Sequence, residues 1–259
     1  MSTFEVPGAE LAVELSDEGG HPVVQLHGLT SSRARDRQLN LDLGRGLSGT
    51  RLLRYDARGH GKSTGRKVPQ DYRWDCLATD LLRLLDRWFP GERVHGVGPS
   101  MGAATLLHAA AREPDRFVGL TLMVPATAWH TRPTQAANYR VAAETIETRG
   151  VGAFIASTRT ATPPPATVGA PETVPDVADA LLPSLFRGAA DSDLPDPEAL
   201  TRIDAPTTIL AWTGDPAHPL STAESLAALL PRSTLTVAHT PAHVETWPQI
   251  LSRDVARRA

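Results

Sequence analysis

The sequence predicts an α/β protein built on a doubly wound, mostly parallel sheet. Short runs rich in Val, Ile, Thr or Leu alternate with longer segments in which apolar residues recur at helical spacing, as in strands joined by crossover helices. The alternation stops after Pro125 and resumes at Thr207. Eight prolines lie between Pro163 and Pro197, inside this gap, and they exclude a long helix or a central strand there. The gap is therefore predicted to be an insertion into one core.

The elements of this core follow from local patterns. Within 71–89 the residues Leu77, Leu81 and Leu84 are spaced for one face of a helix, and the helix that begins at Met101 ends before Pro114. The predicted strands are 23–26, 51–55, 94–97, 118–124, 207–212 and 233–238, and the predicted helices are 33–47, 71–89, 101–112, 135–149, 221–230 and 248–258. We predict that residues 1–125 and 205–259 form the core and that residues 126–204 form the insertion.

Composition excludes several classes of function. The 259 residues carry a formal charge of −3, so the chain lacks the basic surface of a nucleic-acid-binding protein. The single cysteine excludes a disulfide framework and a cysteine-based metal cluster. The amino terminus does not resemble a signal peptide, and no apolar run is long enough to span a bilayer. We expect a cytoplasmic protein, a monomer or homodimer, with no membrane or nucleic-acid partner.

The strongest motif is the sequence Gly98-Pro-Ser100-Met-Gly102, between a predicted strand and a predicted helix. A serine in such a G-x-S-x-G turn is exposed above the sheet, and its hydroxyl can act as a nucleophile. The free amides at the start of the following helix favour negative charge nearby. We therefore expect Ser100 to be a catalytic nucleophile.

A second motif, His27-Gly28-Leu29, directly follows the first predicted strand. A tight turn there can aim the amide of Leu29 at the space above Ser100. Together with the amide of Met101 it would form an oxyanion hole, which stabilises the charge that develops during acyl transfer. His27 itself is expected to be structural.

A serine nucleophile needs a base, and the base needs an acid that orients it. His243 follows the last predicted strand and can reach the same edge of the sheet; His239, four residues earlier, is the alternative. Asp215 follows the strand 207–212 and is the expected acid. Asp191 and Asp193 lie in the insertion and are expected to be solvated turn residues.

Two further segments carry a family resemblance. Residues 55–63, YDARGHGKS, resemble the YDxRGHGxS motif of the α/β-hydrolase superfamily, and 237–243, VAHTPAH, resemble its strand-to-histidine segment. The chain is similar to the branch of small esterases, 3-oxoadipate enol-lactonases and cofactor-free haloperoxidases. The resemblance implies the α/β-hydrolase fold, a triad of Ser100, Asp215 and His243, and a lid over the pocket formed by residues 126–204.

The expected reaction is hydrolysis of a small ester or lactone through an acyl-enzyme, with no cofactor and no metal. The same triad could instead serve perhydrolysis, hydrolysis of a carbon–carbon bond or a biosynthetic elimination. A protein of this fold that binds a small molecule without turnover is the alternative from another class. Trp129 and His130 follow the fourth predicted strand of the core and are candidates for the pocket wall.

Overall fold

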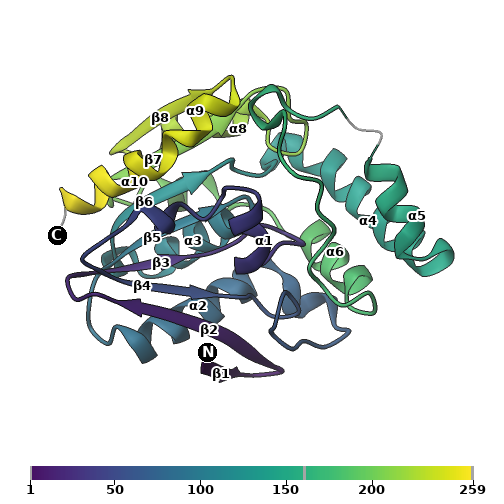
Figure 1. The fold of residues 1–259 in the computed structure, drawn as a ribbon, viewed down its shortest axis with the longest axis horizontal. Helices are drawn as coiled ribbons and strands as arrows, with labels where there is room; N and C mark the ends of the chain where they lie inside the picture. The colour runs from purple at the N-terminus through teal and green to yellow at the C-terminus, as the bar shows by residue number, and fades with distance from the viewer. Residues whose placement is uncertain (1, 160–161, 258–259) are drawn as a thin grey trace.

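The fold is an eight-stranded sheet with helices on both faces (Figure 1), seen in a computed structural model that describes residues 2–159 and 162–257. The strand order is β1-β2-β4-β3-β5-β6-β7-β8. Strands β3 to β8 run parallel, and β1 and β2 are antiparallel to their neighbours. The strands are β1 (Ser2–Val6), β2 (Ala9–Asp17), β3 (His21–Gln25), β4 (Thr50–Tyr55), β5 (Val94–Pro99), β6 (Phe117–Met123), β7 (Thr207–Trp212) and β8 (Ser233–Ala238). The predicted fold class is confirmed.

The parallel strands are buried on both faces, so neighbouring residues of one strand belong to different cores. In β3, Val23 packs into one cluster and Val24 into the other, and in β4 the same is true of Leu52 and Leu53. One face is covered by α2 (Trp74–Trp88), α3 (Met101–Arg112) and α8 (Leu220–Leu229). The other face is covered by α10 (Trp247–Ala256) and the 3-10 helix η1 (Leu43–Gly46).

The predicted helix over 33–47 is wrong in its length. Helix α1 (Arg33–Gln38) ends after six residues, and η1 follows it. Asn40 has φ +59°, in the left-handed region, and this breaks the helix. Asp42 then turns into the protein, where its carboxylate accepts hydrogen bonds from Arg37 and Arg54. The ion pairs of Asp42 with Arg37 and Arg54 therefore outweigh the apolar spacing that predicts a longer helix.

The other predicted elements agree with the structure to within about three residues at their ends. The last predicted helix, 248–258, corresponds to α10, and its final residue, Arg258, lies outside the described residues. The hairpin β1–β2 was not predicted.

Between β6 and β7 the chain leaves the sheet. This segment contains α4 (Arg132–Arg149), α5 (Val151–Thr158), the 3-10 helix η5 (Pro165–Thr167), α6 (Leu182–Ala190) and α7 (Pro197–Leu200). Figure 1 shows α4, α5 and α6 together at one end of the sheet. Side chains of these helices, including Tyr139, Phe154 and Phe186, pack into a separate apolar cluster with Tyr72. The division of the chain into a core and a lid at 126–204 stays a prediction.

Candidate active site

Ser100 lies on a sharp turn between β5 and α3. Its φ is +50° and its ψ is −109°, a conformation that a residue with a side chain rarely adopts. The turn is held because the amide of Ser100 donates to the carbonyl of Met123 at 2.9 Å and its carbonyl accepts from Ala104 at 3.0 Å. Backbone strain held in this way is typical of functional sites.

The two glycines of the motif are required by close packing. A Cβ at Gly98 would lie 3.0 Å from Cβ of Leu26, and one at Gly102 would lie 3.0 Å from the carbonyl oxygen of His27. Neither glycine has a positive φ. Glycine at these positions therefore lets the turn at Ser100 lie directly against the end of β3.

The side chain that meets Ser100 is His218. Its Nε2 lies 2.8 Å from Oγ of Ser100, and its Nδ1 lies 2.7 Å from Oδ2 of Asp215. Asp215 and His218 occupy one turn of the loop after β7, closed by a 3.2 Å hydrogen bond from the amide of His218 to the carbonyl of Asp215. An ionised Asp215 accepts from Nδ1–H and leaves Nε2 to accept the hydroxyl proton of Ser100.

Asp215 is held ionised by its partners. Burial by itself would raise the pKa of this carboxyl, but hydrogen bonds from His218, Trp212 and the amide of Ala217 outweigh it and lower the pKa to about 2. The indole Nε1 of Trp212 donates to Oδ2 at 2.9 Å and the amide of Ala217 donates to Oδ1 at 2.9 Å. The carboxylate is therefore fixed on both oxygens.

His243, which the sequence predicts as the base, does not lie beside Ser100. His243 lies in α9 (Pro241–Glu245), is exposed, and accepts a hydrogen bond on Nδ1 from the amide of His239 at 3.2 Å. His239, the alternative, is also exposed. The structure brings Ser100 and Asp215 together through His218, and this corrects the choice of His243. The physical reason is local, since the turn after β7 already places an imidazole between the hydroxyl and the carboxylate.

The loop after β3 lies beside Ser100. A Cβ at Gly28 would lie 3.9 Å from Cβ of Ser100, which is ordinary contact distance. The ring of His27 fixes this loop: Nδ1 lies 2.8 Å from the carbonyl oxygen of Gly28, and Nε2 accepts from the amide of Ala57 at 2.9 Å. Burial lowers the pKa of His27, so the neutral ring that this pattern needs is favoured. The assignment of the Leu29 and Met101 amides as an oxyanion hole stays a prediction.

A cavity of about 310 Å³ opens onto Ser100 and His218. Its walls are mainly apolar and come both from loops at the end of the sheet, such as Leu29, and from the segment between β6 and β7, which supplies Tyr139, Phe154 and Phe186. A concave apolar site that contains a few polar groups is typical of small-molecule binding.

Trp129 and His130 are not among the described residues that line this cavity. The indole of Trp129 packs against the core, and its Nε1 donates to the carbonyl of Pro195 at 3.2 Å. Its amide donates to the carboxylate of Asp193 at 3.0 Å, so Asp193 is a partner of Trp129 and not a solvated turn residue. The prediction of Trp129 and His130 as pocket wall is corrected accordingly.

The sequence profile of the α/β hydrolase fold family matches residues 21–144, which include Ser100 and the loop after β3. The match covers part of the sheet, and the whole chain has the α/β-hydrolase fold. It is 33% identical over 111 residues to the monoglyceride lipase of Homo sapiens, and the match covers 40% of this chain and 35% of that protein. The chain is thus matched over about a third of the length of this curated relative.

Solved structures resemble this chain over nearly its whole length. A hydrolase from Pseudomonas aeruginosa PA01 has a TM-score of 0.77 at 24% identity and covers 99% of this chain and 97% of its own. An enol-lactonase from Burkholderia xenovorans LB400 has a TM-score of 0.75 at 21% identity, and the match covers 99% of this chain and 98% of the enol-lactonase. At these identities the likeness shows the fold.

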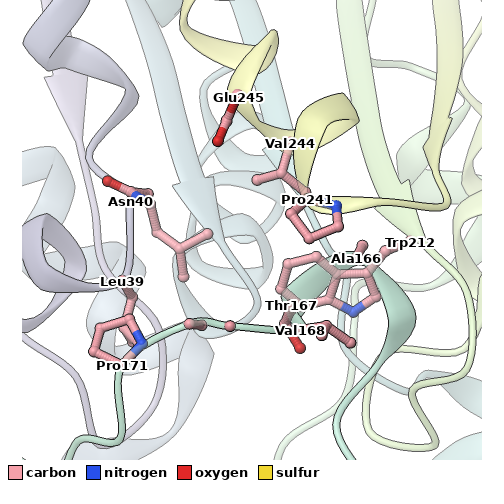
Figure 2. Close-up of a pocket in the computed structure, with 13 residues that line it drawn as sticks. Leu39, Asn40, Ala166, Thr167, Val168, Pro171, Trp212, Pro241, Val244 and Glu245 are labelled. Carbon is pink, nitrogen blue, oxygen red and sulfur yellow. The ribbon is translucent and has the colours of Figure 1, made fainter.

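A second cavity, of about 430 Å³, adjoins the first and shares Leu39, Leu41 and Trp212 with it. Figure 2 shows Leu39 on one side of this space and Trp212, with Pro241 and Val244 of α9, on the other. Helix α9, which carries His243, therefore borders the second cavity. The 3-10 helix η5, from the proline-rich stretch, packs against α9 at the same place.

The sequence analysis did not identify His218, which lies three residues after Asp215 in the segment Asp215-Pro-Ala-His-Pro219. The sequence did contain a signal for His218, since a carboxylate and an imidazole three residues apart in one turn can contact each other.

Among the described residues, no group of His, Cys, Asp or Glu side chains is placed to hold a metal ion. In the same described part of the chain, none of the helices combines the length and the apolar character needed to cross a membrane.

Proposed function

We propose that this protein is a serine hydrolase that cleaves a small carboxylic ester or lactone through an acyl-enzyme, with Ser100 as nucleophile, His218 as base and Asp215 as the orienting acid. The observation that carries this proposal is the continuous contact from Oγ of Ser100 through the ring of His218 to Oδ2 of Asp215, at 2.8 and 2.7 Å. Its geometry fits a nucleophile, a base and a fixed carboxylate.

In the first half of the reaction, Nε2 of His218 takes the hydroxyl proton while Oγ of Ser100 forms a bond to the carbonyl carbon. The amides of Leu29 and Met101 hold the negative oxygen of the tetrahedral intermediate. The intermediate then collapses, the bond to the leaving alcohol breaks, and His218 gives its proton to that oxygen. The product is an ester of Ser100.

In the second half, His218 takes a proton from water, whose oxygen adds to the acyl carbon. Collapse of this intermediate breaks the bond to Ser100, and His218 returns the proton to Oγ. Asp215 stabilises the imidazolium in both halves. For a lactone the leaving hydroxyl stays on the acyl group, and the product is a hydroxy acid.

The proposal is tested with Ser100→Ala, assayed on p-nitrophenyl acetate and with a fluorophosphonate probe. We expect turnover to fall by at least ~10³-fold and labelling to disappear, while circular dichroism stays unchanged. Ser221→Ala, an exposed serine on α8, is the matched control and should keep both activities. Equal hydrolysis by Ser100→Ala would overturn the proposal. A wild-type protein that is not labelled at Ser100 would instead support a binding role without turnover.

A further inference from the structure

Arg35, a charged side chain of the cavity, forms no salt bridge with a carboxylate in the part of the chain that the structure describes. Arg35 of α1 lines the same cavity as Ser100 and His218, where most of the lining is apolar. Its Nε donates to Oγ1 of Thr173 at 2.9 Å, and its Nη1 donates to the carbonyl and hydroxyl oxygens of Thr30 at 3.0 and 3.2 Å. All three acceptors are neutral.

The neighbouring arginines of α1 differ from Arg35 in this respect. Arg33 pairs with Asp56 at 3.0 Å, and Arg37 pairs with Asp42 at 3.1 Å. Nη2 of Arg35 has no hydrogen-bond partner within residues 2–159 and 162–257. The guanidinium is thus anchored on one side and keeps two N–H donors free on the other.

The two carboxyls whose charges act on Arg35 each accept a hydroxyl on one oxygen. Asp36 accepts the hydroxyl of Ser31 at 2.5 Å, and Asp176 accepts the hydroxyl of Ser32 at 2.5 Å. Burial lowers the pKa of Arg35, and the charges of Asp36 and Asp176 oppose this effect without cancelling it. A guanidinium stays protonated at every physiological pH, so the cavity contains a fixed positive charge that is partly desolvated.

We infer that Arg35 selects the substrate, and that the hydrolysed ester or lactone carries a carboxylate that pairs with Nη2 of Arg35. This inference rests on the proposed function of Ser100. A carboxylate accepts charge-assisted hydrogen bonds from a guanidinium, and the interaction is strong where water is partly excluded. The apolar walls would contact the carbon chain between the carboxylate and the ester. Arg35 is therefore a specificity-determining residue.

The test compares acidic esters with neutral esters of similar shape. Monomethyl glutarate is paired with methyl pentanoate, and 3-acetoxypropanoate is paired with butyl acetate, so that the charge lies on either side of the ester bond. Hydrolysis is followed by pH-stat. We expect the wild type to favour the acid of at least one pair by ~10-fold or more in kcat/KM, and Arg35→Gln to reduce this preference by ~10- to 100-fold. In Arg35→Gln, kcat/KM for the neutral esters should fall less than kcat/KM for the acids.

Two control variants separate recognition from structure. Arg35→Lys keeps the charge and should retain part of the preference, whereas a purely structural role would change both esters of a pair equally. Arg45→Gln removes an exposed arginine that contacts Asn40 and should leave the preference unchanged. A wild type without preference for either acid, or an unchanged ratio in Arg35→Gln, would overturn the inference.

A binding measurement distinguishes failure of this inference from failure of the proposed function. In Ser100→Ala, NMR titration gives the dissociation constants of the acids and their neutral partners without turnover. We expect at least one acid to bind more tightly than its neutral partner, and the difference to be lost in Ser100→Ala/Arg35→Gln. If the wild type hydrolyses no ester but this difference is present, the proposed function fails and the recognition role of Arg35 stands. Equal binding of acid and neutral ester would overturn the recognition role.

Discussion

Nδ1 of His218 lies 2.7 Å from Oδ2 of Asp215, and the two residues are only three positions apart in the chain. The proposed base and its orienting acid thus come from one turn, closed by the amide of His218 and the carbonyl of Asp215. Among the described residues, these two side chains form no hydrogen bond with the loop after β8. The loop after β8 and α9 are consequently free to border the second cavity.

The first prediction concerns the identity of the base. His218→Ala should lower kcat for p-nitrophenyl acetate by ~10³- to 10⁴-fold, because Ser100 loses the group that takes its proton. His243→Ala and His239→Ala remove exposed imidazoles and should change kcat by less than ~2-fold. Steady-state kinetics of the three variants decides the matter, and a large loss in His243→Ala with little loss in His218→Ala would contradict the structure.

The proposed nucleophile could be located from the sequence because its signal is local. The G-x-S-x-G spacing between a strand and a helix marks a sharp turn wherever it occurs in the chain, and the structure shows the close approaches that require Gly98 and Gly102. The base is different, since nine histidines are available. Choosing among them requires knowing that the turn after Asp215 points His218 at Ser100, and side-chain direction in an irregular loop is not encoded by periodicity.

The fold was predictable to a similar extent. Buried parallel strands are short apolar runs, so β3 to β8 were found from their composition. The hairpin β1–β2 was missed because it forms one edge of the sheet, where exposed residues such as Glu5 and Glu10 interrupt the apolar pattern. The early end of α1 was missed because it depends on Asp42 meeting Arg54, a residue twelve positions further along the chain.

The second prediction concerns Trp212 as a positioning residue. Its indole donates to the same oxygen of Asp215 that accepts from His218. Trp212→Phe removes this donor while keeping an aromatic ring to stack on Trp247. We expect kcat to fall by ~3- to 10-fold, as for the loss of one hydrogen bond to a charged group, and the pKa of Asp215 to rise from about 2.

Trp247→Phe is the matched control for Trp212, because it alters the other ring of the stack without touching Asp215. It should reduce thermal stability but leave kcat of the folded enzyme within ~2-fold. The pKa of Asp215 is read by NMR titration in both variants. If Trp212→Phe changes KM alone and leaves this pKa in place, Trp212 acts only as a cavity wall.

The third prediction concerns Asp36, a carboxyl at the edge of the active-site cavity. Burial raises its pKa to about 7, although the hydroxyl of Ser31 and the charge of Arg35 oppose this, and its Oδ2 lacks a hydrogen-bond partner in the described structure. The unfolded chain releases this proton near pH 4. Between about pH 4 and pH 7 the folded state therefore binds the extra proton, and the contribution of Asp36 to stability falls as pH rises.

Asp36→Asn should remove this dependence, because the amide stays neutral at every pH. Relative to wild type, its free energy of unfolding should gain up to ~4 kcal/mol between pH 4 and pH 8. Urea titrations at both pH values give the difference. The comparison with wild type is needed because burial also lowers the pKa of His60, to about 3, which by itself makes stability fall as pH decreases below about 6.5. Parallel pH curves for the two proteins would contradict the raised pKa of Asp36.

The last prediction concerns Arg132, which begins α4 and is 4% exposed. Its Nε donates to the carbonyl of Ser192 at 2.7 Å, its Nη1 donates to Oγ1 of Thr127 at 3.1 Å, and its Nη2 donates to the carbonyl of Ala189. The guanidinium also lies 4.3 Å from the ring centroid of Trp74. One side chain thus joins α4 to the end of α6 and to the core.

Two effects compete when Arg132 is replaced by Met. Removing a buried charge relieves its desolvation, which already lowers the pKa of Arg132, but it leaves the acceptors of Thr127, Ala189 and Ser192 without their donor. Among the described residues Arg132 forms no salt bridge, although the charge of Asp193 acts on it, so loss of the donors should dominate. We expect the free energy of unfolding to fall by ~2–3 kcal/mol and KM to rise, since α4 and α6 supply one wall of the cavity.

The control is Arg140→Met, which lies on α4 like Arg132 and breaks an exposed pair with Asp191. It should lower the free energy of unfolding by less than ~1 kcal/mol. Equal urea midpoints for the two variants would show that the contacts of Arg132 do not hold the wall in place.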